Sequence, residues 1–323
     1  MVPKANFARY AWTVLAFNIL VILWGAFVRA TGSGAGCGSH WPLCNGEVLP
    51  RAPQVGTLIE FSHRLSSGIA FILVLILVVQ SLRLYQRGSP VRLGAALSLG
   101  FMITEALIGA GLVLFNWVAQ DASLGRAISI VVHLIITFIL LGCLTLTGWW
   151  ASGGGRIQFA GRGMVSWMIV LGLFGMIILG MSGALTALGD TLFPAVNLAE
   201  AIQQDFSPSA HFLIRLRILH PTIAVIVGGY LIALAGFFRL RTRHRPVLRW
   251  SRLLTALIIV QLGAGLVNVL LLAPVWLQLV HLFLADVVWI SLVMMAASIL
   301  NADLELEAER LVFSVREIGQ QAK

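Results

Sequence analysis

The chain has 323 residues, of which 59% are hydrophobic and only 11% are charged, and its mean hydropathy is +0.94. This composition excludes an ordinary soluble domain and predicts a protein that crosses a membrane several times. The net charge of +9 fits basic loops beside anionic membrane lipid, and we do not expect nucleic acid to be a partner.

Eight apolar runs are long enough to cross a bilayer, which takes about 20 residues of helix. The first run follows Lys4 and Arg9, as a signal peptide would, but its length favours a retained span. We therefore predict an all-α polytopic membrane protein with eight transmembrane helices. In chain order the predicted spans are 11–31, 57–82, 93–116, 124–150, 164–186, 211–238, 249–272 and 275–300.

Basic residues gather in three of the connections between these spans. They are Arg83, Arg87 and Arg92 after the second span, Arg156 and Arg162 after the fourth, and Arg239, Arg241, Arg243, Arg245 and Arg249 after the sixth. Loops rich in Lys and Arg stay on the cytoplasmic side. Both termini are thus predicted to be cytoplasmic, with 301–323 as a short tail. The connections after the first, third, fifth and seventh spans face outward.

The two halves of the chain resemble each other. A Gly, Thr, Gly spacing in the first span and the loop after it, 25–34, recurs at the end of the fifth, 180–189, and the third and seventh spans share the string Gly-Ala-Gly-Leu-Val at 109–113 and 263–267. These matches occur in the same order in each half. They predict two pseudo-symmetric four-helix bundles, an N-terminal one over 1–150 and a C-terminal one over 151–300.

Four histidines, His63, His133, His220 and His281, lie inside separate apolar runs, one on every second run. An ionisable side chain costs several kcal/mol inside a membrane, so it is normally kept because it lines a cavity or binds something. Imidazole is a common axial ligand of haem iron. We predict two haem sites, one on His63 and His133 and one on His220 and His281. The alternative is four hydrogen-bonded core histidines.

The surroundings of the two pairs differ in charge. Glu60 lies three residues before His63, on the same helix face, whereas Arg217 holds that position before His220, with Arg215 close by. A carboxyl beside a porphyrin suits proton transfer, and a guanidinium suits the porphyrin's propionates. The first pocket is therefore predicted to be reactive and the second structural or redox. Alternatively, Glu60 is only the ion-pair partner of Arg64 or Arg29. For Glu105 and Gln261 we expect polar helix contacts.

Cys37 and Cys44 lie in the first outward loop, on the oxidising side of the membrane, where a disulfide can persist. Such a bond would close a short loop and contribute about 2 to 3 kcal/mol. A redox-exchanging pair is the alternative, because partner thiols could reach the loop. Metal binding is the weaker interpretation, because only His40 could join as a third ligand.

The chain resembles the haem A synthase family over nearly its whole length. The resemblance rests on Glu60-Phe-Ser-His63-Arg64, on the loop from Thr31 through Cys37 to Cys44, on the Gly-Ala-Leu-Thr end of the fifth span, and on His220-Pro221. It implies an oxidoreductase in the plasma (inner) membrane of a prokaryote.

For the residues, the resemblance implies a substrate and a cofactor. Haem O would bind between His63 and His133, and its C8 methyl group would be oxidised to a formyl group through an alcohol, with Glu60 as the catalytic carboxyl. His220 and His281 would hold a haem b. Candidates for binding propionates are Arg29, Arg64, Arg215 and Arg217. A haem O synthase and an electron-transfer protein would be partners, besides membrane lipid.

Two other functions fit the same histidines. One is a non-enzymatic di-haem electron carrier, similar to a membrane cytochrome b, and the other is a module that handles or transports haem. A carrier should hold two permanent haems, whereas the enzyme should hold one resident haem b and one exchangeable haem O.

Overall fold

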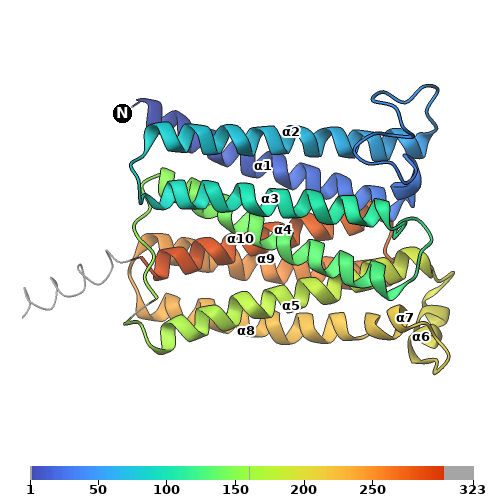
Figure 1. Ribbon diagram of the computed structural model, residues 1–323. Coiled ribbons are helices and arrows are strands. Elements are labelled where there is room, and N and C mark those ends of the chain that lie inside the picture. Colours follow the sequence, from blue (N-terminus) through green and yellow to red (C-terminus); the bar gives the residue numbers. More distant parts are fainter. Residues whose placement is uncertain (1, 160, 302–323) are drawn as a thin grey trace, which may run out of the picture.

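The computed structural model describes residues 2–159 and 161–301, and within these ranges the regular structure is entirely helical (Figure 1). Eight helices are long and apolar enough to cross a membrane, which confirms a multi-pass membrane protein with eight spans. In chain order the α-helices of the described residues are α1 (Val2–Ala30), α2 (Val55–Leu84), α3 (Pro90–Leu114), α4 (Leu124–Ala151), α5 (Met164–Leu192), α6 (Leu198–Phe206), α7 (Phe212–Arg217), α8 (Leu219–Arg241), α9 (Arg245–Leu270) and α10 (Val275–Ile299), with a 3-10 turn, η1 (Ser33–Ala35), after α1. The helices α7 and α8 together form the sixth span, and α6 is not one of the eight.

The sixth predicted span is interrupted near its outer end. The sequence predicts one run over 211–238, whereas the structure has the short helix α7 followed by α8, with the break at Ile218. Pro221 explains the break, because proline lacks an N–H and its ring clashes with the carbonyl four residues earlier, that of Arg217. The helix α6, capped by the Asn197 side chain, precedes this break and was not predicted.

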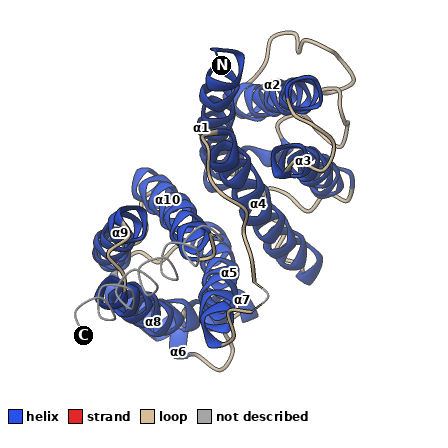
Figure 2. Ribbon diagram, turned by 90° about the vertical axis from the view of Figure 1, so that its left-hand side faces the viewer, coloured by secondary structure: helices blue, strands red, loops and turns tan. Residues whose placement is uncertain are grey.

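Each half of the chain forms a ring of four helices. In the first half α1 packs on α2, α2 on α3, α3 on α4, and α4 on α1, and in the second half α5, α8, α9 and α10 repeat that order (Figure 2). This arrangement is compatible with the predicted pair of pseudo-symmetric bundles. The boundary between residues 150 and 151 stays a prediction.

The two rings meet along α4, which packs against α5 and α10, and along α1, which packs against α10. At the centre of this contact the Trp289 ring stacks on the Phe138 ring, with centroids 5.0 Å apart. Trp289 Nε1 donates a hydrogen bond of 2.7 Å to the Phe138 carbonyl. Because α10 touches both rings, it is the most deeply buried of the long helices.

The connection between the two halves of the chain donates hydrogen bonds to the carbonyls at the C-terminal end of α10. Arg162 donates hydrogen bonds of 2.9 and 2.8 Å to the carbonyls of Ile299 and Asn301, and Gln158 N–H donates to the Leu300 carbonyl. These bonds satisfy carbonyls that a helix end leaves without partners. The start of α1 and the end of α10 lie at the same end of the molecule, as two termini on one side require (Figure 1). Residues 302–323 of the predicted tail lie outside the described residues.

Candidate functional site

The four intramembrane histidines lie at one level of the molecule. Each is six to nine residues from the first residue of its span, counted from Val55, Leu124, Phe212 and Val275. All four spans start at the end opposite the termini, and 1.5 Å of rise per residue puts the histidines about 9 to 14 Å from that end. All four histidines therefore lie near the outward ends of their spans.

The second pair has the separation that axial ligation requires. The rings of His220 and His281 are 6.3 Å apart between centroids, with an interplanar angle of 84°. A metal bonded to two imidazole nitrogens at about 2 Å each places the ring centres roughly 6 Å apart. The residues of the second ring therefore fit an iron porphyrin held between α8 and α10.

The first pair lies on the corresponding helices, α2 and α4. His63 Nδ1 is buried and has no hydrogen-bond partner among the described residues. The two histidines thus come from the helices that correspond to those carrying the second pair in the other ring, and His63 keeps a polar nitrogen that the described residues do not satisfy.

Glycines lie directly against three of the four rings. A Cβ atom added to Gly25 on α1 would lie 2.9 Å from His63, one added to Gly183 on α5 would lie 3.0 Å from His220, and one added to Gly265 on α9 would lie 3.2 Å from His281. Small residues let helices approach closely. In the second half the glycine in this position is Gly183. The sequence repeat between 25–34 and 180–189 aligns Gly25 with a different residue, Gly180. Gly180 does not lie against His220 but packs on Leu134 and Phe138.

The ring nitrogens of the other histidines have different partners. His133 Nδ1 contacts Glu105 Oε2, His220 Nδ1 is 3.0 Å from the Ser182 hydroxyl, and His281 Nε2 is 3.3 Å from Gln261 Nε2. The expected polar helix contacts of Glu105 and Gln261 are confirmed. The sequence did not indicate that each would contact a histidine.

A conventional metal centre is not present in the described part of the chain, which contains no group of three or more His, Cys, Asp or Glu that could hold a metal ion. Haem iron needs only one or two protein ligands, because the porphyrin supplies four nitrogens. Pairs of histidines are therefore the pattern that haem binding requires.

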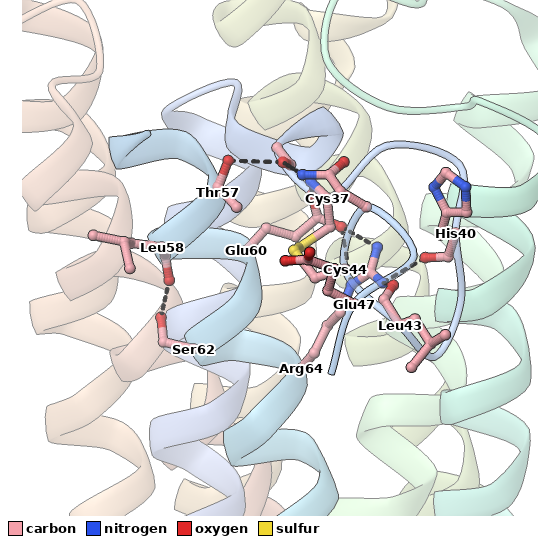
Figure 3. The surroundings of a disulfide bond; sticks show 12 residues. Cys37, His40, Leu43, Cys44, Glu47, Thr57, Leu58, Glu60, Ser62 and Arg64 are labelled. Carbon is pink, nitrogen blue, oxygen red and sulfur yellow. Dashed lines mark hydrogen bonds and ion pairs between the residues drawn. A yellow bond between two sulfur atoms is a disulfide. The ribbon is translucent and has the colours of Figure 1, made fainter. Parts of the chain in front are cut away.

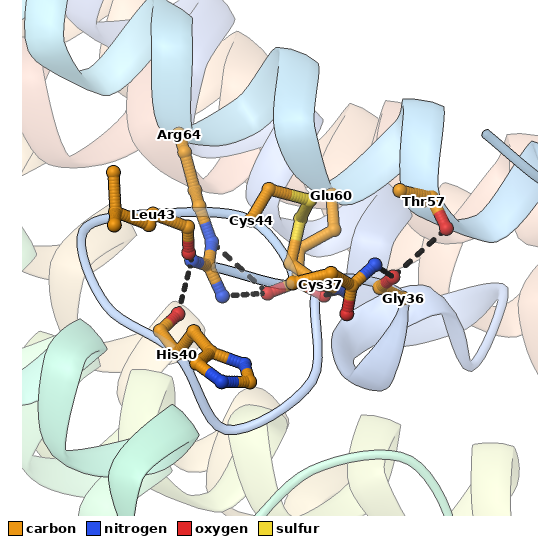
Figure 4. Close-up of polar contacts among 9 residues, drawn as sticks. Gly36, Cys37, His40, Leu43, Cys44, Thr57, Glu60 and Arg64 are labelled. Carbon is orange, nitrogen blue, oxygen red and sulfur yellow. Dashed lines mark hydrogen bonds and ion pairs between the residues drawn. A yellow bond between two sulfur atoms is a disulfide. The ribbon is translucent and has the colours of Figure 1, made fainter. Parts of the chain in front are cut away.

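Glu60 is buried at the outer end of α2, with 3% of its surface exposed. Its Oε1 accepts hydrogen bonds of 3.1 and 2.5 Å from Arg64, and its Oε2 accepts one of 2.8 Å from the Cys37 N–H (Figure 4). The ion pair with Arg64 is thus one of the two pairings that the sequence left open. The pairing with Arg29 does not form, because Arg29 binds elsewhere.

The outer loop is fixed on α2 by one face of that helix. Thr57, Glu60 and Arg64 follow one another at helical spacing, and all three bind the loop backbone (Figure 3). Thr57 Oγ1 donates to the Gly36 carbonyl at 2.8 Å, and Arg64 Nη1 donates to the carbonyls of His40 and Leu43 at 2.6 Å each. The loop therefore covers the end of α2 that carries His63.

The predicted disulfide is present between Cys37 and Cys44. Both residues are fully buried, with 0% and 1% of their surfaces exposed. Thiol exchange requires access to a sulfur atom. Burial beneath the loop therefore favours a structural bond over a redox-exchanging pair.

Replacing both Cys37 and Cys44 with alanine should lower the thermal unfolding temperature and the yield, because the closed loop loses about 2 to 3 kcal/mol of stabilisation. The surviving protein should keep its catalytic turnover. Thermal unfolding and turnover of the same preparation check this, with Cys143→Ala as the matched control. Unchanged stability together with complete loss of turnover would instead establish a redox role.

Three of the four arginine candidates have protein partners, and those of Arg64 are Glu60 and the backbone of the outer loop. Arg29 of α1 crosses to the second ring, where it donates to the Ala187 carbonyl, Thr191 and Gln278 at 2.5, 2.6 and 2.9 Å. Arg217 pairs with Asp190 at 2.9 Å and with Asp205 at 2.7 Å. Arg215 is exposed. Their predicted contact with propionates is not tested by these bonds.

Asp286 is an acidic group that the sequence interpretation overlooked. It lies in α10, five residues after His281, with 0% of its surface exposed. Neither carboxyl oxygen has a hydrogen-bond partner among the described residues. A single Asp among apolar residues was the available signal, and an intramembrane carboxyl is normally functional.

A model of the COX15-CtaA family, described as cytochrome oxidase assembly protein, matches residues 8–293. The chain belongs to this family. The match includes all or most of each of the eight spans, and it contains His63, His133, His220 and His281.

Several curated relatives match parts of the chain. A Thermus thermophilus protein named protoheme IX farnesyltransferase is 54% identical over 268 residues, which is 83% of this chain and 44% of that protein. A heme A synthase of Bacillus mycoides is 40% identical and one of Bacillus cereus 43% identical, each over 140 residues, or 43% of this chain and 44% of the relative. The chain thus matches less than half of each relative's length.

Proposed function

We propose that this protein is a haem A synthase, a membrane oxidoreductase that converts the C8 methyl group of haem O into a formyl group. The observation that carries the proposal is the two histidine pairs at one depth, one of them with rings 6.3 Å apart, in a chain of the cytochrome oxidase assembly family. Relatives named heme A synthase support the same activity.

The two rings of helices have different roles, one binding the substrate and the other binding a cofactor. Haem O binds as substrate between His63 and His133 in the first ring, and a haem b is held by His220 and His281 in the second. The resident haem supplies one-electron redox chemistry when bound. The asymmetry between a carboxyl near the first pair and arginine and aspartate near the second supports this assignment.

Glu60 is the proposed catalytic carboxyl. With water as the oxygen source, each oxidation of the methyl carbon takes up one water molecule and releases two electrons and two protons, giving an alcohol and then a geminal diol, which loses water to give the formyl group; the electrons pass to an electron-transfer partner. These steps release protons, and a buried carboxylate one turn from His63 can accept one. Arg64 and the Cys37 N–H hold that carboxylate in place.

The arginines near the outer end bind the propionates of the two porphyrins. Arg64 serves the first ring, and Arg215 and Arg217 serve the second, together with Arg29, whose guanidinium lies against α5 and α10. A guanidinium matches a carboxylate with two parallel hydrogen bonds. Arg215 is exposed and is the candidate that has the most freedom to turn toward a ligand.

Haem O is a farnesylated haem, so a farnesyl transfer to protohaem IX must supply the substrate. The Thermus thermophilus relative is named protoheme IX farnesyltransferase, which is this activity, and the present chain matches 44% of its length. We propose a haem O synthase as the upstream partner, and an electron-transfer protein that accepts the electrons. The location is the plasma membrane of a prokaryote with both termini in the cytoplasm, which the basic loops support.

Pigment analysis separates this enzyme from a di-haem carrier. Acid extraction and chromatography of purified protein should yield haem B together with haem O or haem A. A carrier would yield haem B in both sites. Haem B alone, from cells that also make haem O, would overturn the proposed function.

A further inference from the structure

One of the four histidines has a carboxylate as its partner. Glu105 Oε2 of α3 contacts His133 Nδ1 of α4, and the Glu105 side chain is only 11% exposed. Thr137, one turn after His133, donates to Glu105 Oε1 at 2.9 Å, and its hydroxyl is equally close to the His133 carbonyl. The carboxylate is therefore fixed by the same helix that carries the histidine.

The other three histidines lack such a partner among the described residues. His220 Nδ1 faces the Ser182 hydroxyl, and His63 Nδ1 and His281 Nδ1 are buried without a hydrogen bond. Gln261, on the helix that corresponds to α3, donates to the His281 carbonyl at 3.1 Å and lies 3.3 Å from His281 Nε2. In the second ring the side chain from this helix that lies beside the histidine is thus a neutral amide, whereas in the first ring it is a carboxylate.

We infer that Glu105 is a positioning residue for His133: it holds the ring by Nδ1, leaves Nε2 for the substrate iron, and strengthens that nitrogen as a donor. This inference rests on the proposed function. A carboxylate that accepts a hydrogen bond from a ligating imidazole fixes the tautomer and the orientation of the ring, and raises the basicity of the ligand. A stronger donor stabilises ferric over ferrous iron.

The consequence is a difference between the two haem sites. The iron on His133 has a lower reduction potential than it would with a neutral partner, whereas Gln261 leaves the second site without this effect. The first site therefore favours oxidised iron, and the second is left to change its oxidation state.

The test uses full-length purified protein, with Glu105→Gln as the main variant and Glu105→Asp as the conservative one. Haem O is added to each preparation, and its binding is measured from the absorbance spectrum. A reductive titration then gives the midpoint potential of the bound haem O. Glu105→Gln should bind haem O about 10- to 100-fold more weakly. The haem O that binds should have a raised midpoint potential, and Glu105→Asp should restore part of both properties.

Haem B content and its low-spin spectrum serve as the internal control for folding, because the second site does not contact Glu105. The matched control Gln261→Leu should alter only the spectrum or potential of that second haem. Wild-type affinity and potential in Glu105→Gln would overturn the inference. If the wild type binds protohaem IX but not haem O, the proposed function fails. The same comparison made with protohaem IX then still decides the role of Glu105.

Discussion

Replacing His281 with alanine should remove the resident haem b from the purified protein. In the proposed function these two histidines would hold the haem b iron, and their rings are 6.3 Å apart between centroids. Loss of one axial ligand leaves the iron five-coordinate and the haem labile. We expect His220→Ala to have the same effect, seen as loss of the six-coordinate low-spin spectrum and of extractable haem B.

Two kinds of variant serve as controls for His281→Ala: histidines of the first ring, and a histidine in a connection at the cytoplasmic end of the helices. His63→Ala and His133→Ala should retain haem b but abolish the conversion of haem O. His244→Ala, in the connection between α8 and α9, should leave both properties unchanged. A His281→Ala protein with a normal low-spin spectrum would show that the second pair does not ligate haem.

Replacing Glu60 with glutamine should lower haem A formation by about two orders of magnitude while haem b remains bound. Glutamine keeps the size of the side chain but cannot accept the proton. Accumulation of the alcohol would place Glu60 in the second oxidation, and untouched haem O would place it in the first. The measurement is chromatography of the pigments formed over time.

The contacts of Glu60 require a control for the loop. Thr57→Val removes a hydrogen bond to the loop from the same face of α2 and leaves the carboxylate intact. It should reduce the rate only slightly. A normal rate in Glu60→Gln would show that Glu60 is only the ion-pair partner of Arg64.

Hydropathy was sufficient to locate all eight spans, because a bilayer imposes one length and one composition on every helix that crosses it. It could not locate the ends of the helices, since backbone hydrogen bonding continues past the apolar run. α5 thus reaches Leu192, six residues beyond the predicted end. The break between α7 and α8 was available from Pro221, a local steric signal that an average over a window hides.

The positions of the four histidines in their spans were predictable from the sequence, but their contacts were not. Four histidines at one depth follow from their places in the spans. The contact of Glu105 with His133 depends on the rotation of α3 against α4, which uniformly apolar helices do not encode. The same holds for Arg29, whose three partners on α5 and α10 come from the other half of the chain.

The central claim is the conversion of haem O to haem A, and expression in cells that make haem O but no haem A tests it most directly. Extracted pigments should contain haem A when the chain is present, and only haem O and haem B with the empty vector. The result that would contradict the account is folded protein that accumulates with haem bound to both histidine pairs while haem O stays unconverted.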